Sequence, residues 1–218
     1  MILEVDSDDT LTKDAVALIK TAYEESKNEK DIYALCFLKH DTKGNIVGKE
    51  FSMSKTTMFD LYFKQGENGE KPLVFFARQR KEYSHLLERN EKFGTEARMY
   101  HMMDLKYKMK CYNEPVIIGD YQEDGYTKNI DKIFRNNPYG YYEYFREMFD
   151  HDLKGILFKK RMYLIKHYIL FSCLTKKKGM LKNVKGRLNK ILVLILYIPG
   201  AIKTRIKFGA KKNNDKEV

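Results

Sequence analysis

Three aspartates within four positions, Asp6, Asp8 and Asp9 in the segment "VDSDD", are the residues of this chain best suited to chemistry. Carboxylates this close repel one another, so a positive group or water must offset the repulsion. Hard divalent cations prefer oxygen ligands, and Mg²⁺ commonly binds one or two carboxylates together with substrate phosphates. The segment therefore indicates a divalent-cation site. The alternative is a solvated loop that helps to cap the next helix.

The elements that must position these acids follow from hydrophobic periodicity. Residues 1–5 are typical of a strand end and 11–26 of an amphipathic helix, so the acids lie between the two. Residues 32–38 form an unbroken apolar run, typical of a strand covered on both faces. Further strands are predicted over 46–51, 73–78 and 115–121, and helices over 54–63, 80–90, 96–108 and 137–149. This alternation of strands and helices indicates an α/β fold.

The charge of the chain is distributed unevenly. The sequence has 41 Lys and Arg and 30 Asp and Glu, a net charge of +11. Residues 151–218 hold 18 of the basic residues and three of the acidic ones. We therefore divide the chain into a nearly neutral body, 1–150, and a basic tail, 151–218, which indicates an anionic partner. Three widely spaced cysteines argue against a disulfide framework and favour a reducing cytoplasm.

The basic tail also carries aliphatic residues at helical spacing. A helix is predicted over 158–174, and a second apolar stripe, opposed by lysines and arginines, follows Met180 until Pro199 ends it. The stripe consists of Val184, Leu188, Ile191 and Ile195. No apolar run reaches the roughly 18–20 residues that span a bilayer. The pattern predicts an interfacial helix on an anionic membrane surface, with packing onto the body as the alternative. Nucleic acid is disfavoured, because the cations lack interleaved aromatic residues suited to stacking.

The order of several short segments resembles that of the family 2 glycosyltransferases. "VDSDDTLTKDAV" is similar to that family's metal-binding segment, in which a strand leads to a D-x-D-D motif and a helix. "FGTEARMYHMMDLKYK" (93–108) is similar to the segment that carries a carboxylate at a helix start. "NEPVIIGDYQEDGYTKN" (113–129) and "NNPYGYYEYF" (136–145) follow in the family's order. The resemblance covers about residues 1–150.

The resemblance implies a partial GT-A domain followed by the basic, amphipathic helical tail. The implied function is inverting transfer of a sugar from a nucleotide-sugar donor to a cell-surface glycan or a lipid-linked acceptor. The implied place is the cytoplasm, peripheral at the inner face of the cell membrane. Mg²⁺ or Mn²⁺ would neutralise the leaving diphosphate. Its implied ligands are Asp6, Asp8 and Asp9.

The resemblance also implies roles for residues outside the acidic segment. Glu96 would accept the proton of the acceptor hydroxyl as general base, although an ordinary first-turn glutamate is the alternative. Gly125, Tyr126 and Thr127 would line the acceptor site, with a plain turn as the alternative. Asp104, on the predicted helix of Glu96, is expected on a solvated face.

Two departures from the family pattern shape the expected partners. Only five residues precede Asp6, where the family has its nucleotide-binding half, so the chain resembles the C-terminal part of such an enzyme. A separately encoded N-terminal half is therefore an expected partner. The segment "GTEA" also lacks the usual aspartate beside the glutamate. The alternative function is that of a catalytically inactive remnant that binds a membrane or a partner protein.

Overall fold

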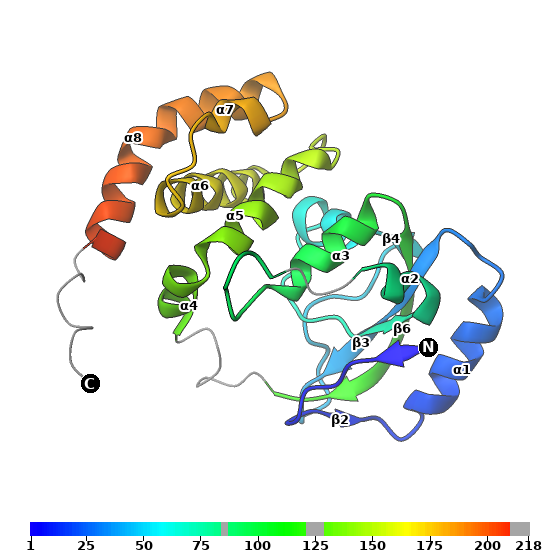
Figure 1. Cartoon of the computed structure of the whole chain (residues 1–218). Coiled ribbons are helices and arrows are strands. Elements are labelled where there is room, and N and C mark those ends of the chain that lie inside the picture. Colours follow the sequence, from blue (N-terminus) through cyan, green and yellow to red (C-terminus); the bar gives the residue numbers. More distant parts are fainter. Residues whose placement is uncertain (84–86, 121–128, 210–218) are drawn as a thin grey trace, which may run out of the picture. The chain divides into compact units, whose positions relative to one another are not determined.

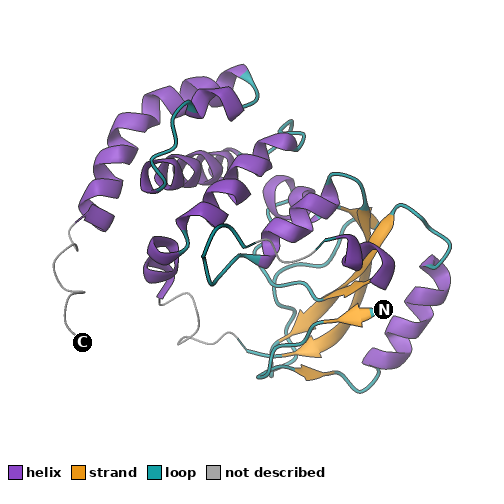
Figure 2. Ribbon diagram, viewed as in Figure 1, coloured by secondary structure: helices purple, strands orange, loops and turns teal. Residues whose placement is uncertain are grey.

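The computed structural model describes residues 1–83, 87–120 and 129–209, and it combines helices with a single mixed sheet (Figures 1 and 2). The α/β class predicted from the sequence is therefore confirmed.

The chain divides into two compact units. The sheet unit comprises residues 1–85 and 99–125, and the helical unit comprises 86–98 and 126–218. This division differs from the predicted boundary at residue 150, because helices on both sides of that position pack against each other in the helical unit.

Six strands of the described residues form the sheet, in the order β1-β5-β3-β6-β2, with β4 also paired to β6. The strands are β1 (Ile2–Leu3), β2 (Thr10–Leu11), β3 (Ile32–His40), β4 (Lys55–Thr56), β5 (Leu73–Phe75) and β6 (Lys108–Ile118). β3 and β6 pair in parallel, and the other pairs are antiparallel. Because β5 is antiparallel to both β1 and β3, the strands β1, β3 and β6 all run in one direction.

The central strand β3 is buried on both faces, as its unbroken apolar run predicts. Cys36 belongs to a hydrophobic cluster that includes Met103, and Phe37 belongs to a second cluster that includes Ala22. Met103 comes from the helix α3 (Glu96–Asp104) and Ala22 from the helix α1 (Ala15–Ser26). Alternate side chains of β3 thus join two cores, one on each face of the sheet.

The segment predicted as a strand over 46–51 is not one. Within it, Ile46 forms an isolated bridge with His40. The carbonyl oxygens of Val47 and Lys49 accept hydrogen bonds from the Lys71 Nζ atom, at 3.0 and 2.7 Å. A buried ammonium therefore takes the place of a neighbouring strand as the donor to these carbonyls. The predicted helices near residues 60 and 80 are short, a helical turn Asp60–Lys64 and α2 (Ala77–Glu82).

Asp104 is buried, and its prediction as a solvated residue was wrong. Its side chain is fully buried, and its carboxylate accepts hydrogen bonds from the backbone N–H groups of Met58 and Phe59 at 3.1 and 2.8 Å. The Tyr33 hydroxyl donates a third hydrogen bond at 3.1 Å, and His101 Nδ1 lies 3.3 Å from Asp104 Oδ2. The first amides of a helical turn lack partners within the turn, which is why a carboxylate is stabilised there.

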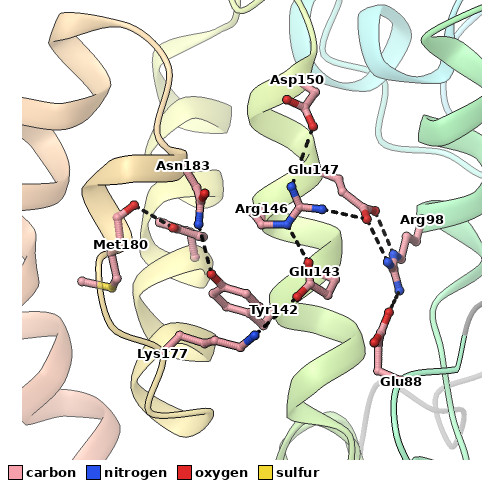
Figure 3. Close-up of polar contacts among 11 residues, drawn as sticks. Glu88, Arg98, Tyr142, Glu143, Arg146, Glu147, Asp150, Lys177, Met180 and Asn183 are labelled. Carbon is pink, nitrogen blue, oxygen red and sulfur yellow. Dashed lines mark hydrogen bonds and ion pairs between the residues drawn. The ribbon is translucent and has the colours of Figure 1, made fainter.

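In the helical unit, helices with aromatic side chains pack against one another. Its elements are α4 (Ile130–Asn136), α5 (Pro138–Glu147), a 3₁₀ turn (Met148–Asp150), α6 (Phe158–Leu174), α7 (Met180–Asn183) and α8 (Arg187–Gly209). The Arg98 guanidinium joins residues 86–98 to α5 through Glu147, with two N···O distances of 2.8 Å, and it also binds Glu88 at 2.9 Å (Figure 3). The predicted helix 158–174 coincides with α6.

Pro199 does not end the last helix, contrary to the prediction. α8 continues from Arg187 to Gly209 through Pro199 and packs along α6 (Figure 1). Gly200 allows this contact, because a Cβ atom there would lie 2.9 Å from Ile169 Cγ2. A proline inside a helix removes one backbone hydrogen bond. Tertiary packing of α8 against α6 offsets that loss.

We expect Asp104→Ala to lower the free energy of unfolding by about 2–4 kcal/mol, because each buried donor left without an acceptor costs about 1–3 kcal/mol. Urea denaturation followed by circular dichroism measures the change. Asp60→Ala is the matched control, since Asp60 is 40% exposed and pairs with Lys64 at the surface. That control should change stability by about 1 kcal/mol or less. Equal stability of both variants would contradict a structural role for Asp104.

Candidate functional site

The acidic segment lies at the end of the sheet where its like-directed strands finish. It connects β1 to β2, and the Asp9 N–H donates to the Asp6 carbonyl oxygen at 3.1 Å in a tight turn. β2 then pairs with the last residues of β6, Thr10 opposite Ile118. In open α/β sheets, ligands bind beyond the carboxyl ends of the strands. The sheet therefore places the acids where such folds hold their ligands.

Three carboxylates from separate parts of the sheet unit meet at this position. Asp6, Asp9 and Glu70 each offer an oxygen, and these oxygens lie within 4.8 Å of one another. Asp6 is exposed and Asp9 is mostly buried, whereas Glu70 comes from the loop before β5. The structure thus brings together two of the three predicted metal ligands and adds Glu70. Among the described residues, Asp8 is exposed and lies outside this group.

The positive group that offsets these acids is the ammonium of Lys39. Its Nζ atom lies 2.7 Å from Asp9 Oδ2 and 2.9 Å from Glu70 Oε2, and its side chain is only 7% exposed. Burial, the largest influence, lowers the pKa of Lys39, but the hydrogen bonds to Asp9 and Glu70 outweigh it and raise the pKa. Lys39 therefore stays charged. The sequence alone indicated a metal ion, helix amides or water in this role.

Gly119 lets Asp9 approach the backbone at the end of β6. A Cβ atom at position 119 would lie 1.7 Å from Asp9 Oδ1, so any side chain there would displace the carboxylate. The Gly119 N–H donates to the His40 carbonyl oxygen at 2.9 Å, which keeps the ends of β3 and β6 together. The close approach of Asp9 to Lys39 thus depends on a glycine at this position.

A buried ion pair fixes the loop that carries Glu70. Lys71 Nζ lies 3.2 Å from Glu67 Oε2, and the two side chains are 0% and 2% exposed. Burial raises the pKa of Glu67, but hydrogen bonds from the amides of Gly69 and Asn68 and the charge of Lys71 give a lowered pKa overall. Glu67 is thus held in its charged form. This loop therefore presents Glu70 to Lys39 from a fixed position.

Glu70 and Lys39 were not predicted as site residues, because both stand between the helices and strands that the sequence predicts. A signal was present in the Glu67-to-Lys71 spacing, where an acid and a base stand four residues apart in the glycine-containing segment "GENGEK". Such a loop can fold back on itself through an ion pair. The pattern does not show that Lys39 is the residue with which Glu70 pairs.

The remaining predicted site residues stay predictions. Glu96 is exposed in the first turn of α3, and it belongs to the helical unit. Gly125, Tyr126 and Thr127 lie outside the described residues. The general-base and acceptor-site roles are therefore untested.

Comparison with known proteins adds no relative: no family model, no curated protein and no solved structure matches the chain.

We expect Lys39→Met to bind Mn²⁺ more tightly than the unchanged protein, on the order of tenfold, because the competing ammonium is gone. The variant should also be less stable without metal, since Asp9 keeps a buried charge with no partner. Differential scanning fluorimetry and isothermal titration calorimetry with Mn²⁺ measure both effects. Lys43→Met, in an exposed turn, is the control. If Mn²⁺ stabilises none of these proteins, the acids form an ion-pair cluster only.

Proposed function

We propose that the chain is the metal-binding part of an inverting, family 2 glycosyltransferase. The observation that carries the proposal is the group of Asp6, Asp9 and Glu70 beyond the carboxyl end of β1. A divalent cation held there would neutralise the diphosphate that leaves a nucleotide-sugar donor. In this proposal Mg²⁺ or Mn²⁺ is the cofactor, and Asp8 supports the site from its exposed position.

Lys39 gives the proposed site a suitable charge. Three carboxylates and one ammonium leave a net charge of −2, which one divalent cation balances. On binding of the cation, the Lys39 ammonium would lose its carboxylate partners and become available to the phosphate oxygens of the donor. Metal and lysine would then share the developing negative charge of the diphosphate.

The donor's nucleotide requires a surface beyond these acids, and the edge of the sheet supports one. β1 pairs with β5 along one side, and along its other side no strand of the described residues pairs with it. The backbone groups of such an edge can take an added strand from another polypeptide. We propose that a separately encoded nucleotide-binding half adds to this edge.

The acceptor side of the proposal follows the resemblance. Glu96, exposed at the start of α3, would take the proton of the acceptor hydroxyl as it attacks the sugar. Gly125, Tyr126 and Thr127 would contact the acceptor, a cell-surface glycan or a lipid-linked sugar.

A peripheral position at the membrane is the second part of the proposal. No helix in the described part of the chain is long and apolar enough to cross a bilayer. The outer stripe of α8 is nevertheless strongly apolar, and each of its members is at least half exposed. The outer stripe consists of Leu188 (53%), Ile191 (50%), Ile195 (65%), Ile198 (68%), Ile202 (55%) and Ile206 (73%).

The geometry of α8 favours contact with an anionic membrane surface. At about 100° per residue, the outer stripe covers an arc of roughly 80° opposite Val193, the buried side chain that faces the rest of the unit. Arg187 and Arg205 border one side of this arc, and Lys203 lies on the other side. These cations flank the stripe, whereas the sequence pattern predicted cations opposite it. An apolar stripe with basic borders is the pattern of an interfacial helix.

The alternative function is a catalytically inactive remnant that binds a membrane. The observation that favours it is that the Lys39 ammonium already pairs with both Asp9 and Glu70. The two functions differ in whether the chain, together with a nucleotide-binding half, transfers sugar.

In that two-part enzyme, we expect Asp9→Asn to abolish metal-dependent release of nucleoside diphosphate from a sugar nucleotide. Glu96→Gln should lower kcat by about 10²–10⁴-fold with little effect on donor binding, since Gln cannot accept the proton. A coupled diphosphate assay with Mn²⁺ measures both. Asp14→Asn, an exposed acid at the start of α1, is the control. Unchanged turnover in Asp9→Asn would reject the metal role, and a chain that never supports transfer would favour the remnant.

We expect the double variant Ile195→Glu and Ile202→Glu to reduce binding to vesicles containing phosphatidylglycerol at least tenfold. Burial of each isoleucine is worth about 1.5–3 kcal/mol, and added carboxylates are repelled by anionic lipid. Vesicle co-sedimentation at low and high salt measures the effect. Val16→Glu is the control, because Val16 is an apolar residue of the sheet unit that is 71% exposed. Equal binding of the double variant and the control would show that the outer stripe does not contact lipid.

A further inference from the structure

A groove lies between the end of α6, the residues that lead into α7, and one side of α8. Its volume is about 890 Å³, within the range of small-molecule binding sites. One wall carries four lysines, Lys176, Lys177, Lys178 and Lys182, and the α8 wall is mostly apolar. The groove therefore combines two kinds of surface that rarely suit a single soluble ligand.

The lysine wall has little compensating negative charge. Lys177 Nζ lies 3.8 Å from Glu143 Oε1 and 5.1 Å from the centre of the Tyr142 ring (Figure 3). Among the described residues, the other three lysines have no acidic partner. Between positions 151 and 209, Asp152 is the only acidic residue of the sequence. The wall therefore attracts an anion.

Lys176 occupies a backbone position that favours glycine. Its φ angle is +55°, and α6 ends there with Lys176 N–H donating to the Cys173 carbonyl at 3.3 Å and Lys177 N–H to the Ser172 carbonyl at 3.0 Å. Glycine is the usual residue at this point of such a helix end, because a Cβ atom is strained in the left-handed region. The lysine thus keeps its charge beside the groove at a cost in backbone energy.

The α8 wall exposes large apolar side chains. Leu194, Tyr197 and Ile198 are 59%, 43% and 68% exposed. Ile198 belongs both to this wall and to the outer stripe, so the groove opens onto the surface proposed to meet the membrane. A ligand that satisfies both walls has an anionic head and a hydrocarbon chain.

We propose that the groove binds one anionic phospholipid of the membrane. Lys176, Lys178 and Lys182 contact its phosphate, and an acyl chain lies along Leu194 and Ile198. Inorganic phosphate would leave the apolar wall in water, and a neutral lipid would leave the lysines without an anion. The proposal rests on the membrane position in the proposed function and deepens it, because it names a site for a single lipid in place of a general attraction.

The test uses monomeric lipid, so that it does not depend on vesicle binding. The chain has no tryptophan, so Tyr197→Trp places a single fluorescent probe in the groove. Dihexanoyl phosphatidylglycerol, below its micelle concentration, should shift the emission to the blue with a saturable response. Dihexanoyl phosphatidylcholine and inorganic phosphate should give at least a tenfold weaker response. Equal responses to the two lipids would overturn the proposal.

Two double variants distinguish binding in the groove from a general attraction to basic residues. In the Tyr197→Trp protein, the double variant Lys178→Gln and Lys182→Gln should weaken binding of dihexanoyl phosphatidylglycerol at least tenfold. The double variant Lys166→Gln and Lys190→Gln removes the same charge at exposed positions outside the groove and should change this binding less than twofold. Equal loss in both would reject a localised site.

Lys176→Gly provides a variant whose failure to bind cannot be explained by unfolding. It should raise the melting temperature by about 2–4 °C, because glycine relieves the strain at position 176, and still weaken the lipid response at least threefold. Unchanged lipid binding would remove Lys176 from the site. If monomeric lipid binds but the outer-stripe variants leave vesicle binding unchanged, the proposed membrane surface is rejected and the lipid groove is retained. If monomeric lipid does not bind but the outer-stripe variants reduce vesicle binding, only the groove is rejected.

Discussion

A single buried ammonium, that of Lys39, is the interaction on which the candidate site depends. It joins Asp9, between β1 and β2, to Glu70, in the loop before β5. Without it, the buried carboxylate of Asp9 would lie beside Glu70 with nothing to balance its charge, which is costly in a medium of low dielectric constant. Any ion that enters the site must therefore compete with a partner already present.

A second ion pair, which is buried from solvent, also supports the candidate site. Glu67 and Lys71 close the loop that presents Glu70, and Lys71 holds the backbone of residues 47–49. Removing one member of such a pair is more damaging than removing both, because the other is left buried and charged. Hence substitutions of Glu67 or Lys71 would change the candidate site without removing any of its carboxylates.

Much of the fold could be predicted from local pattern. The run 32–38 gave a strand buried on both faces, and the helix 158–174 was predicted within its observed bounds, because side-chain periodicity is a local property. The candidate site was predicted only in part. Asp6 and Asp9 stand in a recognisable motif, whereas Lys39 and Glu70 gain meaning only from the way distant segments pair.

Asp104 and Pro199 also show the limit of prediction from local pattern, because there a local rule gave a wrong prediction. A charged residue on a helix is usually solvated, and a proline usually ends a helix, so both predictions followed sound local rules. Tertiary contacts overrode each rule. Asp104 accepts hydrogen bonds from backbone amides of a turn some 45 residues earlier in the chain, and α8 packs against α6.

The pairing of β2 with β6 has a consequence for the order of folding. Thr10 lies opposite Ile118, a separation of 108 positions. Contacts this distant in sequence form slowly. The intervening loop loses conformational entropy on closure before the hydrogen bonds of the strand pair stabilise it. Asp9 directly precedes β2, so it reaches Lys39 only when the sheet is almost complete. A nascent or partly unfolded chain therefore has the acidic motif but no assembled cluster, and any cation bound at this cluster would report on the last stage of assembly.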